Sequence, residues 1–93
     1  MKFRLKARVS RTDERTLHDA LEGLSAECSV NRAGDDFTVE GGIEGGSAAE
    51  LNRNLLSALR KVNRRTTLRS EWISSDNTVE RFFDYVIKVS TRN

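Results

Sequence analysis

The 93-residue chain contains very few of the His and Cys side chains that bind zinc. His18 is the single histidine, Cys28 is the single cysteine, and no C-x-x-C or H-x-x-x-H spacing occurs. Zinc sites in proteins combine several Cys or His ligands at short spacings. The adjacent carboxylates Asp35 and Asp36 lack the spacing of a calcium-binding loop. We therefore expect neither a metal site nor a cofactor.

Nucleophilic catalysis is also poorly supported by the residues present. A serine nucleophile needs a neighbouring base, and His18 directly follows Leu17, which belongs to the apolar face of a predicted helix. This position predicts a histidine beside the core or in solvent. Cys28 has the inward parity of a predicted strand, where a thiol packs as a small apolar group. We expect no catalytic residues and a non-enzymatic protein, with an enzyme using Asp, Glu or Tyr as the minor alternative.

Charge is divided along the chain although the net charge is only +2. The acidic stretch holds one base, Arg32, and the acids Glu27, Asp35, Asp36, Glu40, Glu44 and Glu50. The basic stretch that follows holds no acid and contains Arg53, Arg60, Lys61, Arg64, Arg65 and Arg69. These six bases are our candidates for binding phosphate groups or an acidic partner, with an ordinary solvated surface as the alternative.

A second basic feature lies at the start of the chain, where Lys or Arg occupies positions 2, 4, 6 and 8. Phe3, Leu5, Ala7 and Val9 alternate with them, which predicts a strand with one buried side. Nucleic-acid-binding sheets carry aromatic side chains that stack on bases, and no aromatic can be placed on the open side of the first or third strand. We expect this ladder to be solvated and paired with acids such as Asp36 and Glu40.

The remaining periodicities predict two helices and further strands. Leu17, Ala20, Leu21 and Leu24 mark a helix over about 13–24. Ser47 and Glu50 form a capping box that begins a second helix, which is expected to run to about Arg64 with Leu51, Leu55, Ala58, Leu59 and Val62 on one face. Strands are predicted over 26–32, from Phe37 onward, and over 66–74. The segment 78–89 fits either a strand or a helix, and its β-branched and aromatic residues favour a strand.

The resulting order, β-α-β-β-α-β, resembles the ferredoxin-like superfold over residues 2–74. The resemblance implies an α+β sandwich, with two helices on one face of an antiparallel sheet of order 4-1-3-2. We expect one domain over 1–93, with this core over 1–74 and a C-terminal appendage over 75–93. A fold of this kind does not identify a function.

The C-terminal appendage is the most apolar part of the chain and suggests how the protein acts. We predict an apolar arm of Phe82, Phe83, Tyr85 and Ile87 that pairs with a sheet edge, either in its own chain or in a partner. The leading hypothesis is a non-enzymatic module that binds a protein partner or forms a homo-oligomer. The alternative is a nucleic-acid-binding protein that uses the basic face of the second helix and the other bases of the six named above, either alone or together with the ladder at positions 2, 4, 6 and 8. A membrane span is not expected, and the single cysteine fits a cytoplasmic location.

Overall fold

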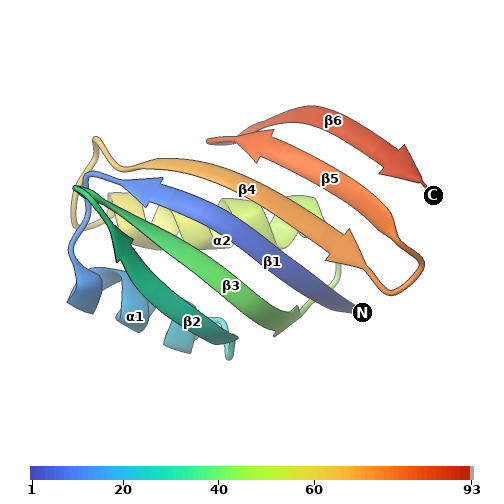
Figure 1. The fold of residues 1–93 in the computed structure, drawn as a ribbon, viewed down its shortest axis with the longest axis horizontal. Coiled ribbons are helices and arrows are strands. Elements are labelled where there is room, and N and C mark those ends of the chain that lie inside the picture. Colours follow the sequence, from blue (N-terminus) through green and yellow to red (C-terminus); the bar gives the residue numbers. More distant parts are fainter. Residues whose placement is uncertain (93) are drawn as a thin grey trace.

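Six antiparallel strands form one sheet in the order β2-β3-β1-β4-β5-β6, and two helices lie against one of its faces (Figure 1). This computed structural model describes residues 1–92, and the side chains of residues 1–88. Its elements are β1 (Lys2–Ser10), α1 (Glu14–Gly23), β2 (Glu27–Ala33), β3 (Asp36–Glu44), α2 (Ala48–Arg60), β4 (Thr67–Ser74), β5 (Thr78–Phe83) and β6 (Val86–Arg92). The predicted α+β class is confirmed.

The alternation in β1 divides the sheet into a covered face and an open face. Phe3, Leu5 and Val9 are buried toward the helices, whereas positions 2, 4, 6 and 8 are exposed on the other face. Leu21, Leu55 and Leu59 belong to the same buried cluster as these β1 residues. The helices therefore cover the predicted side of the sheet, and the basic ladder lies on the open face.

Both helices begin at a side-chain cap. The Asp13 carboxylate accepts the Thr16 amide hydrogen at 2.7 Å, and this hydrogen bond holds the pKa of Asp13 below its usual value. At α2 the Ser47 hydroxyl accepts the Glu50 amide hydrogen at 3.1 Å, as the capping box predicts. These caps satisfy amide groups that have no partner within the helix.

The predicted end of α2 is wrong by four residues, because the helix stops at Arg60. Beyond it the Asn63 side chain accepts the Arg65 amide hydrogen at 3.0 Å and stabilises a turn toward β4. Val62 is 67% exposed, although the helical pattern placed it on the buried face. Arg64 and Arg65 consequently lie in a loop and do not share a helix face with Arg53.

The C-terminal segment forms two strands in place of the single strand or helix that its periodicity allowed. β5 and β6 are joined by a turn at Asp84 and Tyr85, and β5 pairs with β4. The turn interrupts the alternation, so Phe83 and Ile87 face opposite sides of the sheet: Phe83 lies opposite Arg69, and Ile87 lies opposite the buried Phe82. Val89, the last residue of the predicted segment 78–89, lies outside the described side chains.

Close packing between β2 and β3 makes Gly41 a sensitive position. A Cβ at Gly41 would lie 2.2 Å from the Glu27 carbonyl oxygen and 2.5 Å from the Cys28 Cα. Because both neighbours are backbone atoms, Gly41→Ala is expected to lower the free energy of unfolding by about 2 kcal/mol, as measured by urea denaturation. Gly42→Ala is the control, since its Cβ meets only the flexible Lys2 side chain, at 3.4 Å. Equal stability of the two variants would contradict this packing.

Neither helix in the described part of the chain has the length and apolar character that crossing a membrane requires.

Candidate binding surfaces

The six bases singled out in the sequence do not form one surface. Arg53, Lys61, Arg64 and Arg65 are exposed on α2 and on the loop after it. Arg69 lies across from Arg8 in the sheet, on the open face. Arg60 is engaged inside the structure, so the set is divided among three environments.

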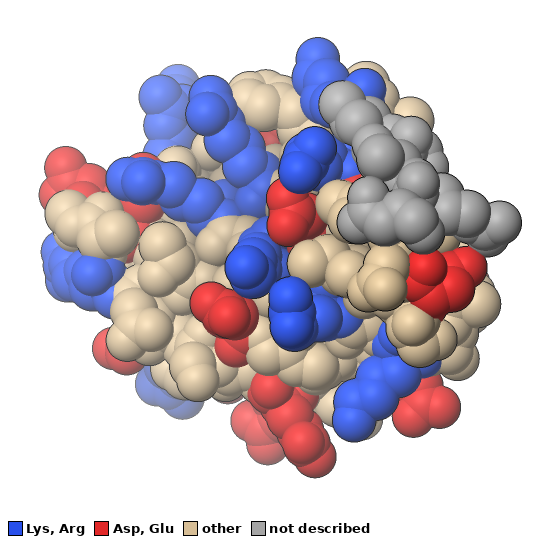
Figure 2. All heavy atoms as spheres, turned by 45° about the vertical axis from the view of Figure 1, so that its right-hand side comes forward, with Lys and Arg blue, Asp and Glu red and all other residues tan. Residues whose placement is uncertain are grey.

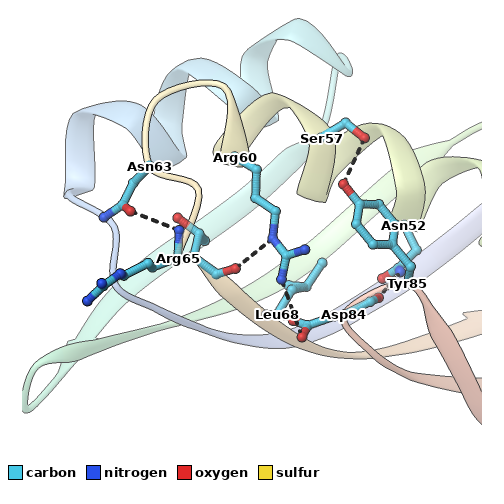
Figure 3. A network of polar contacts seen from close by, with 9 residues as sticks. Asn52, Ser57, Arg60, Asn63, Arg65, Leu68, Asp84 and Tyr85 are labelled. Atoms are coloured by element: carbon cyan, nitrogen blue, oxygen red, sulfur yellow. Dashed lines mark hydrogen bonds and ion pairs between the residues drawn. The ribbon is translucent and has the colours of Figure 1, made fainter.

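Arg60 joins the end of α2 to the β5–β6 turn. Its Nε donates to the Thr66 carbonyl oxygen at 2.9 Å, its Nη2 lies 3.3 Å from Asp84 Oδ2, and its guanidinium carbon lies 5.2 Å from the centre of the Tyr85 ring. The Tyr85 hydroxyl is also hydrogen-bonded to Ser57 at 3.2 Å. These contacts, shown in Figure 3, assign Arg60 a structural role in holding the turn against α2.

A buried polar cluster continues this connection into the core. Asn52 on α2 is 1% exposed, and its Nδ2 donates to the Asp84 carbonyl oxygen at 2.7 Å. Its Oδ1 accepts hydrogen bonds from the Ser70 hydroxyl and from Trp72 Nε1. The β5–β6 hairpin is thereby fixed to α2 and β4 by hydrogen bonds as well as by apolar packing.

The predicted apolar arm is divided by the sheet. Phe82 is only 5% exposed and belongs to the core of its own chain, whereas Phe83 is 39% exposed on the open face. Tyr85, Val86 and Ile87 are exposed at the turn and along the start of β6, with Ile87 at 50%. Because β6 is the outermost strand, these last three residues mark a hydrophobic edge.

The open face of the sheet contains a hollow of about 590 Å³ between β1, β3, β4 and the β5–β6 hairpin. Phe83 lies in its lining, with the Arg69 guanidinium carbon 5.0 Å and the Lys88 Nζ 5.9 Å from the ring centre. The cations in the lining are Lys6, Arg8, Arg69, Arg81 and Lys88. Figure 2 shows Lys and Arg groups spread over one side of the molecule with acidic groups between them. Phe83 was missed as an open-face aromatic because it lies on β5, outside the four strands of the predicted core.

Ion pairs neutralise part of this charge, but among the described side chains Arg8 is the one ladder base with an ion pair, and the expected pairing with Glu40 is not seen. Arg8 Nε lies 2.8 Å from Asp36 Oδ2, and Arg81 Nε lies 2.8 Å from Glu71 Oε2. The hydrogen bond from Arg8, followed in size by one from Ser10, holds the pKa of Asp36 below its usual value. Among the described side chains, none forms an ion pair with Lys6, Arg69 or Lys88.

The residues with metal-binding or nucleophilic potential lie apart. His18 is exposed on α1, 3.8 Å from Glu14. Cys28 is half-buried in β2, and burial raises the pKa of its thiol, which disfavours the reactive thiolate. The described part of the chain contains no group of three or more His, Cys, Asp and Glu side chains placed to hold a metal ion.

Comparison with known proteins yields no match to a protein-family model, a curated protein or a solved structure.

Proposed function

We propose that the protein is a non-enzymatic interaction module that forms a homodimer through the outer edge of β6. In this proposal β1 to β4 with α1 and α2 form a ferredoxin-like core, and the β5–β6 hairpin is the interaction element added to it. Support comes from the strand order, since reading from β4 toward the other edge gives 4-1-3-2 for the first four strands. The hairpin extends the sheet beyond β4.

The observation that carries the proposal is the unprotected β6 edge. β6 pairs with β5 on one side, and on its other side it has no strand partner within residues 1–92. Edge strands present unpaired amide and carbonyl groups that pair readily with another strand. In Figure 1 β6 lies at the outer edge of the sheet, while α2 contacts the hairpin at its turn through Asp84 and Tyr85.

The side chains along this edge favour association. Tyr85, Val86 and Ile87 are three consecutive exposed apolar residues, with Val86 and Ile87 on opposite faces of the sheet and the exposed Lys88 after them. The opposite edge, β2, has exposed polar and charged residues in Glu27 and Arg32, a composition typical of a protected edge. A second copy related by a two-fold axis presents the same β6 edge and the same apolar stretch, which is the arrangement of an isologous dimer.

The test is the molar mass in solution, measured by size-exclusion chromatography with light scattering over a range of concentrations. The wild-type chain is expected to be a dimer, and Ile87→Lys is expected to weaken dimerisation at least about tenfold, because burying an unpaired ammonium group is unfavourable. Val62→Lys is the matched control, since Val62 is also apolar and exposed, at 67% against 50% for Ile87, but lies beyond the end of α2.

Three results would contradict the proposal. A wild-type chain that stays monomeric at millimolar concentration would show that the β6 edge does not mediate dimerisation. An equal loss of dimer in both lysine variants assigns association to another surface. Growth beyond a dimer with increasing concentration indicates head-to-tail pairing of β6 with another edge, because such contacts do not close.

A further inference from the structure

The open face carries an arrangement of charge that folding alone does not favour. Arg8 and Arg69 are directly opposite each other on β1 and β4. Like charges at directly opposed positions destabilise a sheet. Two residues along, Lys6 lies opposite Glu71, which is the favourable combination. The unfavourable pair therefore marks the end of the sheet near Phe83 as a place where an anion would be stabilising.

A carboxylate of the protein itself already supplies a negative charge to one of these two arginines. Asp36 binds Arg8, and the lowered pKa of Asp36 reflects that contact. Arg69 forms no ion pair among the described side chains, but its charge also contributes to the lowered pKa of Asp36, and its guanidinium lies over Phe83. Two adjacent guanidinium groups consequently share one carboxylate, which forms its ion pair with Arg8 alone, and the pair keeps a positive balance that an external anion would offset.

The hollow around Phe83 retains a positive balance after internal pairing. Its lining contains five cations and two carboxylates, Glu40 and Glu71, with Asp36 beside it at Arg8. The ion pairs of Arg8 with Asp36 and of Arg81 with Glu71 neutralise these four charges. Three cations, Lys6, Arg69 and Lys88, then remain, with Glu40 as the one remaining carboxylate of the lining. Arg69 and Lys88 lie over an aromatic ring that is 39% exposed, and Lys6, which is opposite Glu40, lines the same hollow.

We infer that the open face of β1, β4 and β5 binds single-stranded nucleic acid, with one base stacked on Phe83 and phosphates beside Lys6, Arg69 and Lys88. An exposed ring among cations fits a polymer whose units each carry a flat base and a negative charge. The guanidinium of Arg69 lies over the ring, 5.0 Å from its centre, and is a second flat group on which a base can stack. In a duplex the faces of the bases are hidden by stacking, and an acidic peptide has no flat group in each unit. Either ligand would therefore complement the positive charge of this surface but not the exposed ring.

Fluorescence anisotropy with a labelled ten-nucleotide oligothymidylate tests this surface. Binding is expected at low salt, and three phosphate contacts predict a slope of about −2 for log K against log salt concentration. Phe83→Leu keeps an apolar side chain without a stacking face and is expected to weaken binding about tenfold. Arg69→Gln is expected to weaken binding and to reduce the salt slope by about 0.7.

Asp36→Asn gives the sharpest expectation because it should increase affinity. The substitution removes the internal anion from Arg8 and frees that guanidinium for a phosphate. A general role of Asp36 in stability would give weaker binding instead. Arg53→Gln is the control for net charge, since Arg53 is exposed on α2, on the other side of the sheet, and this variant should bind as the wild type does. Thermal unfolding followed by circular dichroism verifies that each variant is folded.

The inference is overturned by any of four results. These are no binding at low salt, unchanged affinity in Phe83→Leu, equal weakening in Arg53→Gln and Arg69→Gln, or equally effective competition by a duplex or by polyglutamate. Lys88 of the proposed surface lies on β6, but Ile87 faces the opposite side of the sheet from Phe83, so Ile87→Lys is expected to keep its affinity even where it abolishes the dimer. Failure of one proposal can thus be distinguished from failure of the other.

Discussion

Replacing Asn52 with alanine is expected to lower the free energy of unfolding by about 3–4 kcal/mol. Asn52 accepts hydrogen bonds from Ser70 and Trp72 and donates one to the Asp84 carbonyl oxygen. Its removal leaves the Ser70 hydroxyl and that carbonyl oxygen without this partner, and each unsatisfied buried group costs about 1–3 kcal/mol. The vacated space adds a cavity term. The unfolding temperature should fall by about 15 °C or more.

Asn54 provides a matched control for this substitution. It lies two residues away on the same helix and is exposed. Asn54→Ala changes the same side chain in the same way, so any difference in helix propensity is shared by the two variants. Urea denaturation should show Asn54→Ala at least as stable as the wild type. Similar stability of the two variants would show that the buried cluster contributes little.

The local parts of the fold were predictable because short-range patterns specify them. The alternation in β1 is compatible only with a strand, and the apolar spacing in α2 only with a helix. The Ser47 cap begins that helix where the sequence predicts. The burial of Asn52 was not predicted, since a single asparagine next to Leu51 in a helix is expected to lie on the exposed side. Its burial depends on Trp72 and Ser70, which lie 20 and 18 residues away in the chain.

Predicting the hairpin and the residues of the open face would have required the register between neighbouring strands. A two-residue turn without glycine divides 78–89, and Asp84 adopts the left-handed conformation at φ 55°. Asp tolerates this conformation better than most residues, but nothing in the neighbouring sequence requires it. The pairing of Phe83 with Arg69 decides that the ring is on the open face. Tertiary structure also separates Arg60 from Arg69, which are close in sequence: Arg60 holds the β5–β6 turn against α2, and Arg69 lies on the open face.

Asp84→Ala is the second large effect that we expect, with a loss of about 3 kcal/mol in the free energy of unfolding. The Asp84 Oδ1 accepts the Leu68 amide hydrogen at 2.9 Å, and its Oδ2 pairs with Arg60. Leaving the Leu68 amide without this acceptor costs about 1–3 kcal/mol. The left-handed backbone at position 84 costs alanine roughly 1–2 kcal/mol more.

Asp84→Asn separates these causes, because asparagine tolerates the left-handed conformation and keeps an oxygen acceptor. It should lose less than half as much stability as the alanine variant. Hydrogen exchange of the Leu68 amide measures the contact directly and should be fastest in Asp84→Ala. Similar exchange in all three proteins would show that the carboxylate does not hold the turn.

The same variant relates the turn to self-association. Asp84 and Asn52 hold the β5–β6 hairpin against α2 and β4, and the hairpin carries the proposed dimer edge. Loosening the turn makes ordering of β6 part of the cost of association, so Asp84→Ala should weaken the dimer. A dimer that keeps its full affinity while the Leu68 amide loses protection would mean that β6 is not the surface on which two chains meet.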